Sequence, residues 1–203
     1  MERWDNYALQ VQQAKRYFLK YDQQALIRKC SLKWDETYMY LSLFGVLYRL
    51  NRENGDLERR EGEAWKDGNS HAEVMTVLDL LCDSREDRCA AGRWKSMESF
   101  GLMFHQNLLQ KKRDPQAEWI DREPEKFRRA CESLGGRPES GADIGYSLPV
   151  FEDLRICLRF WHGDEEFYPQ LRYFWDENAR MYLKYETMFF AVGLLLQHLK
   201  NAP

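Results

Sequence analysis

The sequence contains no long apolar run. The longest such run, Met188 to Leu196, is too short to cross a lipid bilayer, which takes about 20 apolar residues in a helix. The first ten residues, MERWDNYALQ, are charged and lack the apolar stretch that marks a secretory signal peptide. These absences predict a cytoplasmic protein without a membrane partner.

The cysteines are odd in number and irregularly spaced. The chain has 5 cysteines and no C-x-x-C motif, and the spacing of Cys82 and Cys89 fits neither a zinc nor an iron–sulfur site. An odd, scattered set is typical of reduced thiols that pack as small hydrophobic groups. Cys89 is the one cysteine in an evident basic loop, near Arg85, Arg88 and Arg93, which could lower its pKa and make it reactive. We predict no metal site and no cofactor.

The motifs of several enzyme classes are missing as well. The sequence has no G-x-S-x-G nucleophile elbow, no glycine-rich phosphate loop and no histidines at zinc-ligand spacing. Because no catalytic constellation is complete, a non-catalytic accessory domain that binds a small ligand or a protein partner is favoured over an enzyme.

Neither sign of charge dominates. The chain has 30 Lys and Arg against 33 Asp and Glu, a net charge of -3, and the two signs are interspersed. Non-specific binding to nucleic acid requires a basic excess, so we expect no nucleic-acid partner. A hydrophobic content of 44% and an aromatic content of 14% exclude disorder as the main state and suit a single domain over residues 1–203.

Hydrophobic spacing predicts helices at both ends of the chain. Apolar residues recur at helical spacing through residues 1–30, which predicts an N-terminal helix, and residues 185–199 form a largely apolar C-terminal helix. Between them, Ser70 and Glu73 form a capping box, which predicts the start of a middle helix. Asp and Glu residues followed by proline predict further helices at 115–121 and 124–134.

Period-2 alternation predicts hairpins. In the first extended stretch Gly45 marks a bulge or a tight turn, and Asn54-Gly55 predicts a hairpin with a type I′ turn. Residues 154–161 and the stretch around 170–175 alternate on either side of the sequence HGDEE. The predicted fold is therefore a single α+β domain, in which N-terminal, middle and C-terminal helices pack on a hairpin-rich, mostly antiparallel sheet.

Three segments carry a family resemblance: YLSLFGVLYRLNRENGDL, AGRWKSMESF and FEDLRICLRFWHGDEEFYPQLRYFWDENARMYL. Over residues 35–200 their order and spacing resemble the bacterial and archaeal domain-of-unknown-function family 3786. In that family we expect an aromatic-Gly-x-x-Tyr strand, a Trp-x-Gly-Asp-Glu-Glu-Phe turn and a strand that ends in Asp. The matching residues are Phe44, Gly45 and Tyr48, then Trp161, Gly163, Asp164, Glu165, Glu166 and Phe167, and finally Asp176.

The resemblance implies little chemistry. Some relatives are fused to a cysteine-rich iron–sulfur domain, similar to that of corrinoid proteins. This chain lacks such a cysteine cluster, so the resemblance carries over no iron–sulfur cofactor, and electron transfer is the weakest of the functional hypotheses.

The acidic turn at 162–166 is the first candidate site. His162 beside Asp164 could form a general acid–base pair, and the adjacent carboxylates of Asp164, Glu165 and Glu166 could bind Mg²⁺ or Ca²⁺ through their oxygens. The other interpretation is a β-turn, in which Gly163 supplies a positive φ and Asp164 bonds nearby backbone. An enzyme that uses this turn, with or without a divalent metal, is the alternative to a binding domain.

Aromatic and basic residues of the last two strands are the second candidate site. Trp161 and Trp175 could line a pocket with Arg155 and Arg159, suited to an anionic aromatic ligand, and Arg172 lies on the returning strand. The other interpretation is packing at the core and rim, in which Trp161 and Trp175 form a cross-strand pair. In a variant of the acidic turn, Asp164 or Glu166 turns inward and pairs with Arg155, Arg159 or Arg172.

Overall fold

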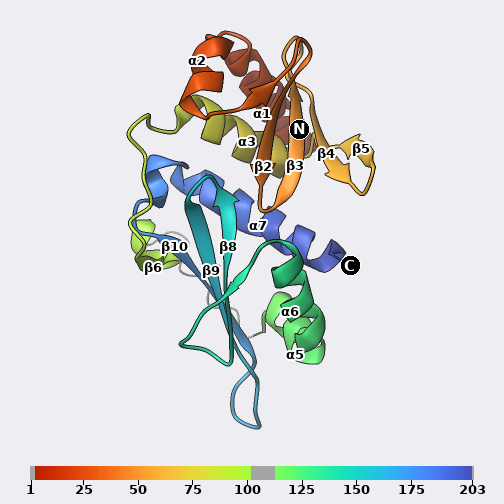
Figure 1. Ribbon diagram of the computed structural model, residues 1–203. Helices are drawn as coiled ribbons and strands as arrows, with labels where there is room; N and C mark the ends of the chain where they lie inside the picture. Colours follow the sequence, from red (N-terminus) through yellow and green to blue (C-terminus); the bar gives the residue numbers. More distant parts are fainter. Residues whose placement is uncertain (1–2, 102–112, 203) are drawn as a thin grey trace. The chain divides into compact units, whose positions relative to one another are not determined.

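The computed structural model describes residues 3–101 and 113–202 of the 203-residue chain, which form two compact units (Figure 1). The first unit comprises Met1–Arg88 and Arg180–Leu194, and the second comprises Cys89–Ala179 and Leu195–Pro203. Each unit has its own antiparallel sheet and its own helices, which confirms the α+β class. That residues 1–203 make one domain stays a prediction. Within the described ranges, no helix has both the length and the apolarity that a membrane span requires.

The first unit is built on a five-stranded sheet of order β1-β2-β3-β4-β5, in which all neighbours are antiparallel. Figure 1 shows α1 and α3 on one face of strands β2 and β3. Alternate side chains of β2, those of Met39, Leu41 and Leu43, are buried. The elements are α1 (Arg3–Phe18), α2 (Gln23–Lys29), β1 (Lys33–Trp34), β2 (Tyr38–Leu43), β3 (Val46–Asn51), β4 (Leu57–Glu61), β5 (Ala64–Asp67), α3 (His71–Asp83) and the first part of α7 (Tyr185–Asn201).

Two helices stand where one was predicted over residues 1–30. The chain leaves α1 after Phe18 and starts α2 at Gln23, after a short turn. Asp22 is the physical reason, because its carboxylate accepts hydrogen bonds from the backbone N–H groups of Gln24 at 2.9 Å and Ala25 at 3.1 Å. A side chain that caps a new helix in this way favours a break over a continuous helix.

The type I′ turn lies at a different hairpin from the one predicted. Phe44 and Gly45, with φ values of 52° and 75°, join β2 to β3 as a two-residue turn, so Gly45 marks a tight turn. At Asn54-Gly55 only the glycine has a positive φ, and the Asn51 side chain accepts hydrogen bonds from the next backbone N–H groups. The hairpin predicted there exists, but a longer turn closes it.

A buried polar network attaches α3 to the sheet. The capping box is confirmed, since Ser70 Oγ accepts from the Glu73 N–H and the Glu73 carboxylate accepts from Ser70. Glu73 is 3% exposed, and its Oε1 also accepts from the Tyr48 hydroxyl at 3.1 Å and from Arg59 at 2.9 Å. Burial, and then the neighbouring Glu73 carboxylate, raise the pKa of Tyr48. The network satisfies a buried carboxylate and orients the first turn of α3.

The second unit is built on an antiparallel sheet of order β6-β10-β9-β8-β7. The predicted helices at 115–121 and 124–134 are confirmed, and Asp114 caps the first with proline at its first position. The elements are β6 (Trp94–Ser96), η1 (Met97–Phe100), α5 (Pro115–Arg122), α6 (Pro124–Ser133), β7 (Arg137–Pro138), β8 (Ile144–Phe151), β9 (Leu154–Trp161), β10 (Gln170–Asp176) and the last part of α7. The two units divide within the short helix η3 (Ala179–Met181).

Strand β8 has no counterpart in the predicted fold. It carries Pro149, a residue that removes a backbone donor and argues against a strand. The sheet accommodates it because Pro149 lies where the register between β8 and β9 shifts, at a β-bulge before Phe151. A two-residue turn at 152–153 then returns the chain into β9.

Candidate functional site

The acidic turn holds its own loop in shape. Asp164 accepts hydrogen bonds from the N–H groups of Glu166 at 2.8 Å and Phe167 at 2.7 Å, as the β-turn interpretation predicts. Gly163 does not have a positive φ, so that part of the prediction is wrong. A Cβ at Gly163 would instead lie 2.8 Å from Cδ of Pro169, which explains the glycine by close packing. Asp164 and Glu166 are solvent-exposed.

His162 lies with acidic partners from outside the turn. Its Nδ1 is 2.8 Å from Asp121 Oδ1 of α5, and its backbone N–H donates to Asp143 Oδ2 at 2.9 Å. His162 therefore pairs with Asp121, and the Asp164 side chain bonds the backbone of its own loop. The structure does not bring His162 and Asp164 together as an acid–base pair. In residues 3–101 and 113–202, no three His, Cys, Asp or Glu side chains gather as metal ligands.

The two tryptophans of the second candidate site are separated by the strand register. Trp161 pairs with Gln170 and Trp175 pairs with Ile156, at opposite ends of the β9–β10 ladder. Trp175 is fully buried, whereas Trp161 is half-buried beneath the Arg172 guanidinium at 5.7 Å. They do not line one pocket together.

The arginines of that site contact backbone and rings. Arg155 donates to the Ser147 carbonyl at 2.5 Å, and burial is the main cause that lowers its pKa. Arg159 lies over the Phe174 ring at 4.8 Å. These contacts are those of side chains that cover the sheet, without a carboxylate from the acidic turn.

Asp176 is the acidic residue of the family motif that the fold buries. It is 3% exposed, and its carboxylate accepts from the N–H groups of Ala91 at 2.8 Å, Gly92 at 2.7 Å and Asn178 at 2.8 Å. It therefore fixes the segment before β6 against the end of β10 in the second unit. Its role in the structure is to satisfy loop backbone.

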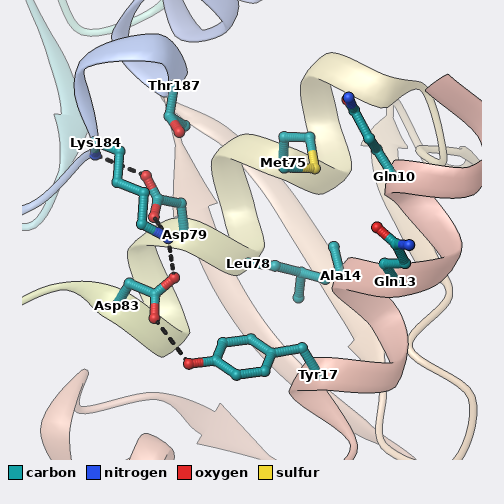
Figure 2. Close-up of a pocket in the computed structure, with 10 residues that line it drawn as sticks. All are labelled: Gln10, Gln13, Ala14, Tyr17, Met75, Leu78, Asp79, Asp83, Lys184 and Thr187. Atoms are coloured by element: carbon teal, nitrogen blue, oxygen red, sulfur yellow. Dashed lines mark hydrogen bonds and ion pairs between the residues drawn. The ribbon is translucent and has the colours of Figure 1, made fainter. Parts of the chain in front are cut away.

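A different site emerges in the first unit, where α1, α3 and the start of α7 surround a pocket of about 330 Å³ (Figure 2). Neither candidate from the sequence contributes to it. Figure 2 shows an apolar floor from α1 and α3 and a charged wall at the side of α7. The lining residues are Gln10, Gln13, Ala14, Tyr17, Met75, Leu78, Asp79, Asp83, Lys184 and Thr187.

The charged wall is an aspartate pair one helical turn apart that shares one lysine. Lys184 Nζ lies 3.1 Å from Asp79 Oδ1 and also contacts Asp83 Oδ2. The backbone N–H of Lys184 donates to Asp79 Oδ2 at 2.7 Å. Partial burial opposes the charge of Lys184, but the bonds to Asp83 and Asp79 outweigh it and raise the pKa of the ammonium.

Two tyrosines of the N-terminal segment complete the wall. The hydroxyls of Tyr17 and Tyr21 lie 3.4 Å and 3.3 Å from Asp83 Oδ1, and they bond each other at 2.9 Å. Burial, then the bond to Tyr17 and the charge of Asp83, raise the pKa of Tyr21. Tyr17 can donate its hydroxyl proton to Asp83, whereas the single hydroxyl proton of Tyr21 goes either to Asp83 or to the Tyr17 oxygen.

The sequence contains a signal for this wall, although neither predicted site includes it. Asp79 stands inside the apolar stretch VLDLLC of α3, and Asp83 follows four positions later on the same face. An acidic residue within an apolar helix segment requires a partner when it is buried. The partner, Lys184, lies 105 positions away, so no local pattern identifies it.

A half-buried cluster of rings and cations lies on the first sheet. The Arg49 guanidinium lies 4.2 Å from the Tyr38 ring and 4.4 Å from the Trp65 ring. It also forms an ion pair with Glu58 at 2.7 Å, which neutralises it.

Comparison with known proteins yields a family. The model of the family described as "Domain of unknown function (DUF3786)" matches residues 22–198, which is most of the chain and confirms the resemblance found in the sequence. No curated protein and no solved structure matches the chain.

Proposed function

This chain belongs to the DUF3786 family, and from that premise we propose that it is a non-catalytic accessory domain that binds a small ligand. The ligand occupies the pocket between α1, α3 and the start of α7. The single observation that carries the proposal is this pocket, which combines an apolar floor with convergent charged groups.

The size and lining of the pocket support a small ligand. A volume of about 330 Å³ lies at the lower end of the range for ligand sites, roughly 300–1,000 Å³. Ala14, Met75 and Leu78 offer apolar contact, and Gln10 and Gln13 place amide groups at the edge. Few polar groups around apolar surface are the usual means by which a site orients a ligand.

The proposal extends to the environment of the protein. A cytoplasmic location is supported by five free cysteines, of which Cys89 is exposed, because exposed thiols persist in reducing compartments. The balance of 30 basic and 33 acidic residues supports a partner other than nucleic acid.

A pocket-filling substitution tests the function. Ala14→Leu adds volume to the apolar floor, and Ala8→Leu makes the same change at an exposed position of the same helix. The purified protein and both variants are screened by thermal shift against a metabolite library, and native mass spectrometry detects co-purifying ligands. We expect a compound that stabilises the parent and Ala8→Leu but not Ala14→Leu. Binding that Ala14→Leu leaves unchanged, or a library without any binder, contradicts the proposal.

A further inference from the structure

The pocket has a defined sign of charge. Its lining includes three charged side chains, the carboxylates of Asp79 and Asp83 and the ammonium of Lys184, so the formal charge of the lining is one negative. All three belong to the first unit. A partly desolvated site with uncompensated negative charge favours a ligand of opposite sign.

One carboxylate oxygen of Asp79, Oδ1, is held by an ion pair alone. Its side chain is 5% exposed, and Oδ2 is satisfied by the Lys184 backbone N–H. Within the described part of the chain no group donates a hydrogen bond to Oδ1, and Lys184 Nζ approaches it to 3.1 Å without hydrogen-bond geometry. A ligand N–H that takes the place of the Lys184 ammonium, whose side chain is 58% exposed, would give this buried oxygen the hydrogen bond that it lacks.

The same groups disfavour an anion. Lys184 is the cation of the lining, and two carboxylates already share its charge. A ligand carboxylate or phosphate would have to approach within a few ångströms of both aspartates, which repel it.

The remaining surface suits an aliphatic body. Ala14, Met75 and Leu78 form the floor, and the Tyr17 ring stands beside Asp83, where it can face a cation. Taking about 30 Å³ for a water-sized group, the pocket holds on the order of ten non-hydrogen atoms.

We infer that the ligand class of this pocket is a small aliphatic amine or guanidine, whose cationic head donates to the Asp79–Asp83 pair while its alkyl chain covers the apolar floor. The inference rests on the proposed function and specifies its ligand. The negative charge, the Asp79 oxygen without a hydrogen bond and the apolar floor all favour this class of ligand.

Three matched probes test the charge of the ligand: n-pentylamine as its ammonium ion, 1-pentanol and pentanoate. Binding to the full chain is followed by NMR of methyl-labelled methionine, with Met75→Leu to assign the reporter signal. We expect the Met75 methyl to shift with pentylammonium, less at high salt, and not with the neutral or anionic probe.

Two substitutions complete the test. Asp83→Asn neutralises the lining and should weaken pentylammonium binding about tenfold or more, whereas Asp87→Asn, an exposed aspartate outside the pocket, should leave it unchanged. Asp83 is chosen because Asp79 also holds the backbone of Lys184. Unchanged affinity in Asp83→Asn overturns the inference.

The failure of the inference is distinguishable from failure of the proposed function. If pentanol or pentanoate shifts the Met75 methyl as strongly as pentylammonium, the pocket binds ligands but the cationic class is wrong. The same holds if no probe binds while an uncharged or anionic library compound binds and Ala14→Leu abolishes its binding. If neither the probes nor the library compounds reach the pocket, both proposals fall.

Discussion

Lys184 is joined to Asp79 twice, by its backbone N–H to Oδ2 at 2.7 Å and by its ammonium to Oδ1 at 3.1 Å. The two contacts use both carboxylate oxygens and fix the residue that precedes α7 against α3 in the first unit. The ammonium can exchange its contact for water or a ligand, because its side chain is 58% exposed, but the backbone bond is structural. Asp79, which contributes to the negative charge of the pocket, is therefore also a residue on which the fold depends.

Asp79→Ala should destabilise the protein by about 1–3 kcal/mol, because it leaves the Lys184 N–H without its acceptor and frees the shared lysine. Urea unfolding followed by circular dichroism measures the change. Asp87→Asn, which breaks an ion pair between exposed side chains, should change the free energy of unfolding by less than about 0.5 kcal/mol. Equal effects in the two variants would contradict the role assigned to Asp79.

Asp176 and Asp164 differ in burial although both bond loop backbone. Asp176→Ala removes the acceptor of three backbone N–H groups at a site that is 3% exposed, so we expect a loss of roughly 2 kcal/mol or more. Asp164→Ala acts in an exposed loop, where water replaces the carboxylate, and should cost less than about 1 kcal/mol. Chemical denaturation of both variants checks this order, which a larger loss in Asp164→Ala would reverse.

The same substitution should have opposite signs at two glycines. Gly45 has a φ of 75° in the β2–β3 turn, so Gly45→Ala should destabilise by about 1 kcal/mol. Gly193 lies exposed in α7, and within the described residues nothing outside its own helix turn lies within 4 Å of an added Cβ, so Gly193→Ala should stabilise by about 0.5–1 kcal/mol. Thermal unfolding of the two variants reports the signs directly, and two shifts in the same direction would refute the argument.

His71 should make the protein less stable in mild acid. It packs against the rings of Tyr7 and Phe190, its Nε2 is 2.6 Å from Gln10 Oε1, and burial lowers its pKa. In the unfolded chain a histidine titrates near pH 6.5. Below that pH the unfolded state binds more protons than the folded state, which shifts the equilibrium toward unfolding. The contribution of neutral His71 to the free energy of unfolding is therefore complete above about pH 6.5. It is lost as the pH falls through the lowered pKa of the folded state.

The measurement for His71 is the urea midpoint at about pH 7.5 and about pH 5.5, on either side of the unfolded pKa. We expect the midpoint to fall on acidification, and to fall less in His71→Gln, which removes the titrating group. An identical fall in the variant would show that other groups are responsible.

Cys89 should be the one thiol that reacts quickly in the folded protein. It is exposed, and the other four cysteines are buried. Burial raises the pKa of Cys82 to about 12 and that of Cys157 to about 11, which keeps both as thiols at neutral pH. Mass spectrometry after brief treatment with N-ethylmaleimide should show one adduct, and none in Cys89→Ser. Rapid addition of several groups would show that the buried thiols open readily to solvent.

Elements with a local signal could be predicted from the sequence. The Ser70–Glu73 capping box starts α3, and proline after an acidic residue starts α5 and α6 at Pro115 and Pro124. In each case the residues that form the cap lie within four positions of one another, so a sequence pattern records the interaction. The period-2 alternation of β9 and β10 is likewise local, and both strands are present.

Elements that depend on distant partners could not be predicted. Strand β8 contains Pro149, and only its pairing with β9 through a bulge makes that residue acceptable. The type I′ turn at Phe44-Gly45 places a phenylalanine at a φ of 52°, which the buried ring compensates by packing in the core.

By itself, the sequence determined the α+β class, the family and most helix starts, because these follow from spacing and capping among neighbouring residues. The sequence also located the acidic turn and its charges, but not the directions in which those side chains point. Tertiary structure alone decided where the charges meet: it left Asp164 and Glu166 in solvent, buried Asp176 beneath loop backbone, and brought Lys184 to Asp79 across 105 positions. The physical reason is that a buried charge must find a partner in space, and the chain distance to that partner leaves no trace in local sequence.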